Sequence, residues 1–367
     1  MRAAVFAGGK LDIRSIEPPV MGPNQLRVSP IAVGICGSDL SAREHTEEFL
    51  QWNSDIGATG TAFDPGTGVV LGHEFTSRIT EVGSNVAGYA VGDKIVTLPH
   101  AVGPNGVRYT VGYSNAYPGG LAEDVVVEAS GHLLIPDGVP AVEAAVTEPM
   151  ATGLNAVLRS RIAPPDGALV TGCGPVGLGA VVELSARNVY PIVASDPSLR
   201  RRQAAAAMGA DQTIDPLVDD PVTAWLDLAC PGQRLFVFEA AGRAGLLNKL
   251  LYRVPNFSKI VVVGVCSTDD VIRPGVGVSK NISIDFVGGP GYRDDSYYAF
   301  DAMFRHIARG KVDLQSVVTG YTGLQGVPAV FDSLRPKDPS DIEHIKVLVC
   351  HDLSSSEILD SRPTAPA

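Results

Sequence analysis

The chain has 367 residues, of which 45% are hydrophobic and 19% charged, and its formal net charge at pH 7 is −11. This length exceeds what one hydrophobic core usually supports, so two domains are expected, and the composition is typical of a well-packed globular enzyme rather than a disordered or fibrous chain. The negative charge excludes nucleic acid and anionic membrane as main partners, because affinity for polyphosphates comes largely from Lys and Arg.

The N-terminal residues and the cysteines indicate the compartment. Residues 1–7 alternate like an opening strand and have neither the apolar segment nor the cleavage site of a signal peptide, and no apolar run is long enough to cross a bilayer. The five cysteines are widely spaced, odd in number and without a CxxC pair, so they do not predict a disulfide framework. We therefore expect reduced thiols and a cytoplasmic location.

The predicted elements change in kind along the chain. Residues 1–150 are rich in Gly, Pro and Val, and their short apolar stretches between turn signals predict a mostly β domain. From residue 168 onward strands and helices alternate, which predicts a parallel sheet with crossover helices. The predicted strands are 168–171, 191–195, 234–239, 259–264, 280–287 and 345–350, and the predicted helices are 176–189, 198–208, 243–252 and 295–309.

A glycine-rich fingerprint, Gly172-Cys-Gly-Pro-Val-Gly177, lies between the first strand of this region and the following helix. Its glycines allow a tight turn, close approach of the backbone to a pyrophosphate, and close packing of helix on strand. Asp196 ends the next strand, nineteen residues after Gly177, where a carboxylate can bind the ribose hydroxyls. This context favours a dinucleotide site over a glycine turn without a ligand. Asp196 favours NAD over NADP, although the arginines at 200–202 either pair with a 2′-phosphate or are solvated surface residues.

Three short segments supply possible metal ligands: Cys36-Gly-Ser-Asp39, Gly72-His-Glu74 and Glu148-Pro-Met-Ala-Thr152. A catalytic zinc takes three protein ligands from Cys, His and carboxylate and keeps a fourth position open. Taken singly, the cysteine can also be a small buried hydrophobe, the histidine a hydrogen-bonded core residue, and the third glutamate a carboxylate at a helix start. Together with a dinucleotide fingerprint, they favour a zinc site that serves hydride transfer to or from an alcohol.

In this order, the three segments and the fingerprint resemble the zinc-dependent medium-chain alcohol and polyol dehydrogenase family over nearly the whole chain. The resemblance implies an α/β fold, with a GroES-like β-rich catalytic domain formed by both chain ends and a Rossmann domain with a doubly wound parallel sheet. The expected domains are 1–150 for the first part of the catalytic domain, 151–288 for the Rossmann domain, and 289–367 for the return to the catalytic domain with a frayed tail. Glutamate as the third ligand resembles the sorbitol, threonine and glucose dehydrogenase branch.

The same resemblance assigns site residues. The zinc ligands are matched by Cys36, His73 and Glu148. Glu74 matches the glutamate that can replace the metal-bound water, Asp39 the carboxylate that hydrogen-bonds the ligand histidine, and Ser38 the hydroxyl that receives the alcohol proton. The residues expected to bind the cofactor are Gly172, Gly174, Pro175, Val176, Gly177, Asp196, Arg201, Thr152, Val263 and Lys346. Among these, Thr152 is expected beside the nicotinamide ring and Lys346 at the pyrophosphate.

The chain departs from the family pattern in three places. The region 98–120, where many members bind a structural zinc through four cysteines, has no cysteine, so one catalytic zinc and no structural zinc are predicted. The position three after Ser38, often a relay histidine, is Ser41, and His45 either substitutes for it or is an ordinary surface histidine. The third departure is a longer stretch between the first two ligands.

That stretch contains an insertion at 44–68, which is longer than most loops of a compact domain and is expected to overhang the substrate cleft. Its Phe49 and Trp52 either form an apolar wall of the cleft or pack the insertion against its own domain. The same two explanations apply to the tyrosines of the cysteine-free region. These tyrosines are Tyr109, Tyr113 and Tyr117.

The reaction implied by the resemblance transfers hydride between an alcohol and NAD, giving a ketone or aldehyde, and it favours secondary alcohols, polyols or sugars. Zinc acts on the substrate oxygen as a Lewis acid, and the cofactor carries the hydride chemistry. Two alternatives stay open: a zinc-free quinone or enone reductase on the same fold, and a catalytically silent NAD-binding protein. Because family members pair along the edge predicted at 280–287, a homodimer or homotetramer is expected.

Overall fold

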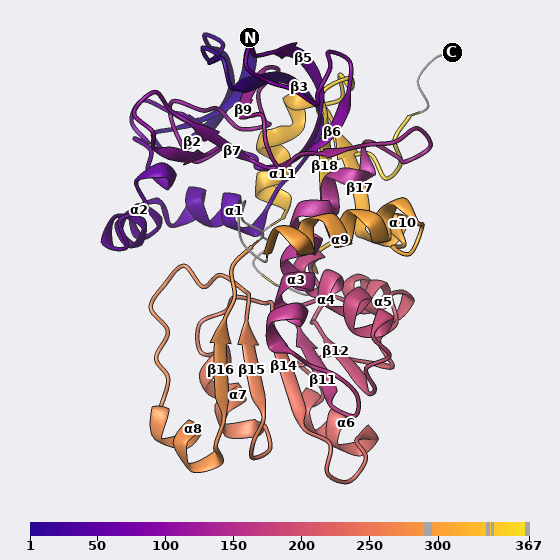
Figure 1. The fold of residues 1–367 in the computed structure, drawn as a ribbon. Coiled ribbons are helices and arrows are strands. Elements are labelled where there is room, and N and C mark those ends of the chain that lie inside the picture. Colours follow the sequence, from indigo (N-terminus) through magenta and orange to yellow (C-terminus); the bar gives the residue numbers. More distant parts are fainter. Residues whose placement is uncertain (290–295, 335–337, 339–340, 364–367) are drawn as a thin grey trace. The chain divides into compact units, whose positions relative to one another are not determined.

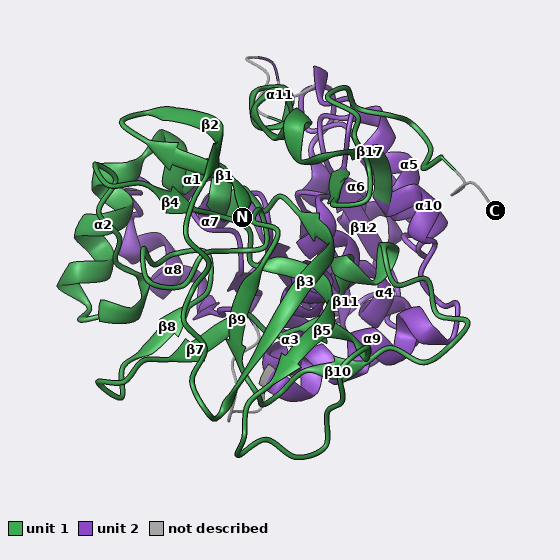
Figure 2. Cartoon of the chain, turned by 90° about the horizontal axis from the view of Figure 1, so that it is seen from above, with its two compact units in different colours: residues 1–147, 318–335, 346–367 green, residues 148–317, 336–345 purple. Residues whose placement is uncertain are grey.

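The computed structural model describes residues 1–289, 296–334, 338 and 341–363, and Figure 1 shows its fold. The chain forms two compact units, which are coloured separately in Figure 2. Unit 1 consists of Met1–Thr147, Val318–Arg335 and Lys346–Ala367, and unit 2 of Glu148–Val317 and Pro336–Ile345. Among the described residues, no helix has both the length and the apolarity needed to span a membrane.

Unit 1 is mostly β-sheet. Its strands are β1 (Arg2–Ala7), β2 (Lys10–Ser15), β3 (Gln25–Gly34), β4 (Val69–Val70), β5 (Glu74–Val82), β6 (Lys94–Thr97), β7 (His100–Val102), β8 (Arg108–Thr110), β9 (Val125–Glu128), β10 (Leu133–Leu134), β17 (Val318–Thr322) and β18 (Lys346–Cys350). Its helices are α1 (Gly37–Glu44), α2 (Thr46–Asp55) and α11 (Val327–Ser333), with short 3-10 turns η1 (Thr59–Thr61), η2 (Glu143–Val146) and η3 (Leu324–Gly326). The largest sheet has the strand order β10-β6-β5-β3-β18-β17, and β9 also pairs with β3.

Strand β3 organises unit 1. It is antiparallel to β5 over most of its length, and Leu348 of β18 pairs with Gly34 at its end. Its buried side chains, among them Leu26 and Val28, belong to the hydrophobic core of the unit. Because β18 comes from the last segment of the chain, both ends of the sequence contribute strands to this sheet.

Unit 2 is a parallel sheet connected by helices. Its strands are β11 (Gly167–Thr171), β12 (Ile192–Ser195), β13 (Gln212–Ile214), β14 (Leu235–Glu239), β15 (Lys259–Val262) and β16 (Ser283–Phe286). Its helices are α3 (Thr147–Ser160), α4 (Pro175–Ala186), α5 (Leu199–Ala207), α6 (Pro221–Leu228), α7 (Leu246–Arg253), α8 (Pro274–Lys280), α9 (Ser296–Ala308) and α10 (Leu314–Val317). The order β13-β12-β11-β14-β15-β16, parallel throughout, is that of a doubly wound dinucleotide-binding sheet and confirms the predicted fold class.

The boundary of unit 2 differs from the predicted one. The sequence analysis ended the Rossmann domain at residue 288, whereas α9 and α10 belong to unit 2. A buried face and a contact between His306 Nε2 and Glu183 Oε2 of α4, 3.1 Å apart, tie α9 to this unit. The buried apolar residues of α9 are Ala299, Phe300, Met303, Phe304 and Ile307. The turn residues near 288 therefore mark the end of the sheet but not the end of the unit.

The insertion at 44–68 is structured rather than an open loop, since it contains all of α2 and of η1. Phe49 on α2 is 7% exposed and belongs to the hydrophobic core of unit 1, while Trp52 is 40% exposed. Of the two explanations given for these aromatic residues, packing against its own unit therefore holds for Phe49.

Candidate metal centre and active site

Cys36 lies at the start of α1, directly after β3. Its backbone is extended (φ −84°, ψ 154°), which makes it the N-cap of the helix. The Asp39 carboxylate accepts a hydrogen bond from the Cys36 backbone N–H at 3.0 Å, as the third helical residue does in a capping box. Asp39 is fully buried. The helix start thus fixes a thiol and a carboxylate at one point of unit 1.

His73 lies in the turn between β4 and β5. Gly72 before it has φ +96°, and a Cβ there would lie 3.0 Å from side-chain carbons of Val33 and Leu121, so this turn requires glycine. The Nδ1 atom of His73 lies 3.2 Å from Asp39 Oδ1. If Nδ1 donates its proton to that carboxylate, Nε2 is left with the free lone pair that a metal binds.

Glu74 is the first residue of β5, and its side chain is fully buried. Its Oε2 accepts a hydrogen bond from Lys346 Nζ at 2.6 Å, and the same ammonium donates to the Ile35 carbonyl at 2.7 Å. A Cβ at Gly34 would clash with Glu74 Oε2, so glycine makes room for the carboxylate. The other oxygen, Oε1, is buried without a hydrogen-bond partner among the described residues. Such an oxygen is a place where a cation can bind.

The ligand atoms of Cys36, His73 and Glu74 lie within 4.8 Å of one another. A thiolate, an imidazole and a carboxylate at this spacing are a donor set that zinc accepts. Burial and the charge of Glu74 raise the pKa of the Cys36 thiol. Burial lowers the pKa of His73, but the charges of Asp39 and Cys36 outweigh it and hold that pKa well above its ordinary value. Both shifts mean that a metal would have to displace a proton from each of these side chains. The three donor atoms and Glu74 Oε1, unpartnered in the described part of the chain, are what fit a divalent cation.

Glu148, the predicted third zinc ligand, lies in the first turn of α3 and belongs to unit 2. Thr152 lies one helical turn further on, and a Cβ at Gly289 would be 3.2 Å from Thr152 Oγ1 and 3.8 Å from Glu148 Oε1. Within unit 1, the glutamate that accompanies Cys36 and His73 is Glu74. The role of Glu148 at the metal stays a prediction.

The fingerprint from Gly172 to Gly177 joins β11 to α4. Gly172 has φ +88°, and a Cβ there would lie 2.7 Å from the Ala241 backbone nitrogen, while a Cβ at Gly177 would clash with the Gly172 carbonyl. Both positions therefore require glycine. A Cβ at Gly174 would meet nothing within 4 Å, so there is open space beside the start of α4. This geometry fits a pyrophosphate at a helix N-terminus, where Pro175 and Val176 begin the first turn.

Asp196 directly follows β12 and is 2% exposed. Its Oδ2 accepts a hydrogen bond from the Cys173 backbone N–H and its Oδ1 one from the Ser198 backbone N–H, each at 2.9 Å. Arg201 Nη1 lies 3.7 Å from Asp196 Oδ2, and Val263 directly follows β15. The carboxylate therefore supports the fingerprint turn, and the contacts of these residues with a cofactor stay predictions.

Lys346 has partners other than the expected pyrophosphate. Its ammonium is buried in unit 1 and is bonded to Glu74 and to the Ile35 carbonyl. Burial lowers the pKa of Lys346, but the charge of Glu74 outweighs it and raises that pKa, so the ammonium keeps its proton. A lysine at the start of an otherwise apolar, buried strand indicates a buried acidic partner. The sequence does not identify that partner, because it does not show that β18 pairs with β3.

Ser38, in the first turn of α1, has its Oγ 2.9 Å from the Tyr113 hydroxyl oxygen, within hydrogen-bond distance. That hydroxyl also lies 3.1 Å from Asp39 Oδ1. The sequence analysis offered only a cleft wall or packing for Tyr113, because no spacing pattern links residue 113 with residue 38. His45 lies at the junction of α1 and α2, and its side chain makes no capping hydrogen bond to α2. Its substitution for the relay histidine stays a prediction.

Comparison with known proteins gives consistent matches over both units. Residues 22–137 match the alcohol dehydrogenase GroES-like domain, and residues 175–309 match the zinc-binding dehydrogenase model. (R,R)-butanediol dehydrogenase of Bacillus subtilis (strain 168) is 29% identical over 334 residues, which are 87% of this chain and 91% of that protein. L-threonine 3-dehydrogenase of Pyrococcus abyssi is 28% identical over 340 residues, 88% and 92% of the two chains. The crystal structure of 2R,3R-butanediol dehydrogenase from Bacillus subtilis has a TM-score of 0.77 at 27% identity and covers 95% of this chain and 99% of that one.

A GroES-like unit, a Rossmann-type unit and a Cys-His-Glu donor set together define the class of zinc-containing oxidoreductases that act on CH–OH groups. The chain belongs to the zinc-containing medium-chain alcohol dehydrogenase family. The family and the fold class inferred from the sequence are therefore confirmed. The chain is an NAD(P)-dependent alcohol dehydrogenase-like oxidoreductase.

Proposed function

We propose that this protein is a zinc-dependent dehydrogenase that uses NAD to oxidise secondary alcohols, including vicinal diols and polyols, to ketones. The observation that carries the proposal is the group of Cys36, His73 and Glu74, of which the last two are buried and whose ligand atoms lie within 4.8 Å of one another. The names of the relatives support the substrate class, because 2,3-butanediol and the 3-position of threonine each carry a secondary hydroxyl. A cytoplasmic location and a single zinc per chain complete the proposal.

Each residue of the proposed site has a separate role in the reaction. Zinc, when bound, would polarise the substrate oxygen and lower its proton affinity. Cys36 and His73 would hold the metal, with Glu148 as the proposed third ligand, and Asp39 would keep the His73 ring in its binding orientation. Ser38 would take up the alcohol proton. NAD, when bound beside Thr152, would accept the carbinol hydride.

The proposal of NAD rather than NADP rests on the acidic end of β12. A carboxylate at Asp196 favours ribose hydroxyls and repels a 2′-phosphate. Two of the three neighbouring arginines have protein partners: Arg202 donates to the Asp196 carbonyl at 2.7 Å and Arg200 to the Glu343 carbonyl at 2.7 Å. Arg201 remains close to Asp196 itself. These contacts support a site shaped for NAD.

One experiment tests the metal, the cofactor and the substrate class together. The wild-type protein is assayed with NAD and with NADP on primary alcohols, secondary alcohols, polyols and sugars, and its zinc content is measured. We expect turnover of secondary alcohols or polyols with NAD, and we expect Cys36→Ser to lose bound zinc and at least about a hundredfold of kcat/KM, because the thiolate ligand is gone. Cys230→Ser, at an exposed free cysteine, is the matched control. Full activity of Cys36→Ser would contradict the proposal and favour a zinc-free reductase.

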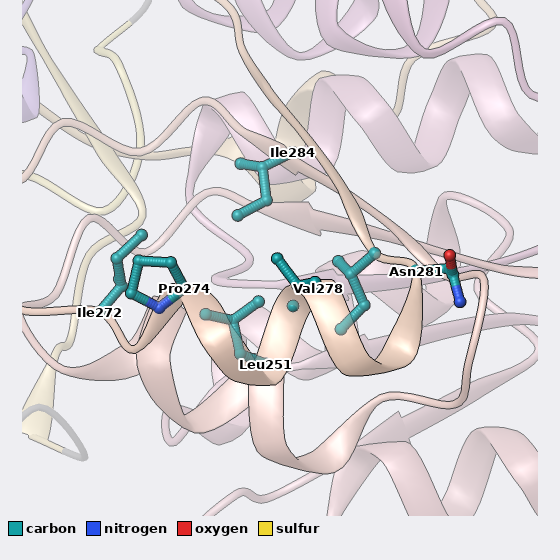
Figure 3. Close-up of a pocket in the computed structure, with 8 residues that line it drawn as sticks. Leu251, Ile272, Pro274, Val278, Asn281 and Ile284 are labelled. Atoms are coloured by element: carbon teal, nitrogen blue, oxygen red, sulfur yellow. The ribbon is translucent and has the colours of Figure 1, made fainter.

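The proposed assembly is a homodimer or homotetramer formed through the edge of the unit 2 sheet. β16 is the last strand of that sheet, and Figure 1 shows it next to β15. Phe286 on this strand is 71% exposed, and Val278 on α8 is 77% exposed. Val278 also lines an apolar hollow of about 350 Å³ (Figure 3). Its lining residues are Leu251, Ile272, Pro274, Gly277, Val278, Asn281, Ile282 and Ile284. An open strand edge with apolar neighbours supports pairing with a second copy.

A further inference from the structure

A tyrosine from the cysteine-free region reaches the hydroxyl proposed to accept the alcohol proton. The Tyr113 oxygen lies 2.9 Å from Ser38 Oγ, and its hydroxyl donates to Asp39 Oδ1 at 3.1 Å. The same Asp39 carboxylate accepts from the Cys36 backbone and lies 3.2 Å from His73 Nδ1. Tyr113 thus connects Ser38 with the carboxylate that orients the predicted ligand histidine.

The segment that carries Tyr113 lies directly on the turn that carries His73. Gly112 has φ +96°, and a Cβ there would lie 3.1 Å from the Gly72 carbonyl oxygen. The Gly120 backbone N–H, from the end of the same segment, donates to that carbonyl at 2.7 Å. Tyr113 is 6% exposed, and its ring centroid lies 5.2 Å from that of His73. Close backbone packing and a ring contact therefore set the position of the tyrosine.

The insertion at 44–68 also holds this tyrosine. The ring centroid of Phe49 on α2 lies 5.2 Å from that of Tyr113. Asn115, two residues after the tyrosine, donates to the Gly68 carbonyl at 2.6 Å. A ring contact and a side-chain hydrogen bond thus join the insertion to the tyrosine segment.

We propose that Tyr113 is a positioning residue for Ser38, and that the insertion serves the active site by holding Tyr113 in place. The inference rests on the proposed function, in which Ser38 takes up the alcohol proton. The Tyr113 hydroxyl has one proton, and the Asp39 carboxylate can only accept it, so the Tyr113 oxygen is left to accept from the Ser38 hydroxyl. The Ser38 hydrogen is then held toward Tyr113, and its lone pairs point in restricted directions. Ser38 then meets the substrate hydroxyl in one prepared orientation and does not have to be ordered at each turnover.

Kinetics of Tyr113→Phe test the proposal, because this change removes the hydroxyl and keeps the ring. We expect kcat to fall about tenfold, KM to change less than about twofold, and zinc content to match the wild type, since one hydrogen bond to the proton acceptor is lost. Tyr117→Phe is the matched control: its hydroxyl donates to the Val102 carbonyl at 3.3 Å, away from Ser38, and wild-type kcat is expected. A wild-type kcat in Tyr113→Phe would overturn the proposal.

A double-mutant cycle separates positioning of Ser38 from general support of the segment. Ser38→Ala should lower kcat about a hundredfold, as the loss of a proton-transfer group does. Adding Tyr113→Phe to Ser38→Ala should then lower kcat by less than about a further twofold, because the group through which Tyr113 acts is already absent. If the two losses multiply, Tyr113 acts independently of Ser38 and the inference fails.

A measurement without turnover tests the contact in a protein whose Tyr113 is intact. In protein labelled with ¹³C at the tyrosine Cζ atoms, Ser38→Ala should shift one tyrosine resonance, because it removes the hydroxyl that is hydrogen-bonded to Tyr113. Tyr117→Phe identifies a resonance that should stay in place. If no resonance shifts although the wild-type enzyme is active, the Tyr113 inference alone is overturned. If the wild-type protein turns over no alcohol, the proposed function fails, whatever the spectrum.

Discussion

The Glu74 carboxylate is fully buried, with one oxygen paired to Lys346 and the other without a hydrogen-bond partner among the described residues. We expect Lys346→Met to lower the free energy of unfolding of the zinc-free protein by about 3 kcal/mol, because it leaves a buried charge unpaired. The loss should be smaller with zinc bound, since the cation replaces the missing positive charge. Denaturant unfolding with and without a zinc chelator measures both values.

A matched control for this change is Lys259→Met in unit 2. Lys259 Nζ lies 2.7 Å from Asp285 Oδ2 in a partly exposed pair, and such pairs contribute less than about 1 kcal/mol. Equal losses for Lys346→Met in the zinc-free and zinc-loaded protein would show that the cation does not share the Glu74 charge. This result would contradict the assignment of Glu74 as a metal-binding residue.

A second residue-scale prediction concerns the buried His132. Its Nδ1 accepts a hydrogen bond from the Leu98 backbone N–H at 3.1 Å, and its Nε2 lies 2.7 Å from the Glu128 carbonyl, so the folded protein holds it neutral. Burial and the nearby His100 lower the pKa of His132 to about 3. Below pH 6.5 the unfolded chain therefore binds a proton that the folded protein refuses, and stability falls as the pH falls. Between pH 6.5 and 5 the expected loss from this residue is about 2 kcal/mol.

His132→Gln checks this prediction, because an amide can both donate to the Glu128 carbonyl and accept from Leu98 but does not titrate. From pH 7 to pH 5 the unfolding free energy of the wild type should fall by about 2 kcal/mol more than that of the variant. Parallel pH profiles for the two proteins would mean that folding does not change the pKa of His132.

At the scale of elements, we predict that the chain assembles through the edge strand β16. Phe286 is 71% exposed on this strand, and a charge there should prevent a second copy from pairing. We expect light scattering after size exclusion to give a multiple of the chain mass for the wild type and the mass of one chain for Phe286→Asp. Leu217→Asp, at a 70% exposed position elsewhere in unit 2, should keep the wild-type mass. If Phe286→Asp also keeps it, the assembly uses another surface.

Elements with a strong apolar pattern could be predicted from the sequence, and elements that depend on tertiary contacts could not. The strand–turn–helix from β11 to α4 carries its own glycine signals and was found, and α6, β13 and α8 were missed. The insertion illustrates the limit. Its pattern indicates neither that α2 is helical nor that Phe49 turns into the core of unit 1. One ring partner of Phe49, Tyr113, comes from a segment more than sixty residues away, which periodicity does not reveal.

At the scale of the whole molecule, strand order decides which parts of the site could be predicted from the sequence. Ligand chemistry pointed to Cys36 and His73 and the family resemblance to Asp39, and the structure brings these together through a helix cap and a glycine turn of the same unit. Neither pointed to Lys346 as the partner of Glu74, because that contact depends on how β18 enters the sheet. Sequence signals therefore predicted candidate ligands, and strand order was needed to find the residues that support them.

The position of β18 also affects how the enzyme is made. This strand lies between β3 and β17, and its first residue supplies the ammonium beside Glu74, 272 residues later in the chain. At about 5–20 residues per second, the ribosome needs about 15 to 50 seconds to translate from one residue to the other. All six strands of the unit 2 sheet are translated within that interval. The nascent chain can therefore complete the sheet of unit 2 first. The Lys346 ammonium that pairs with Glu74 is added only when synthesis is nearly finished.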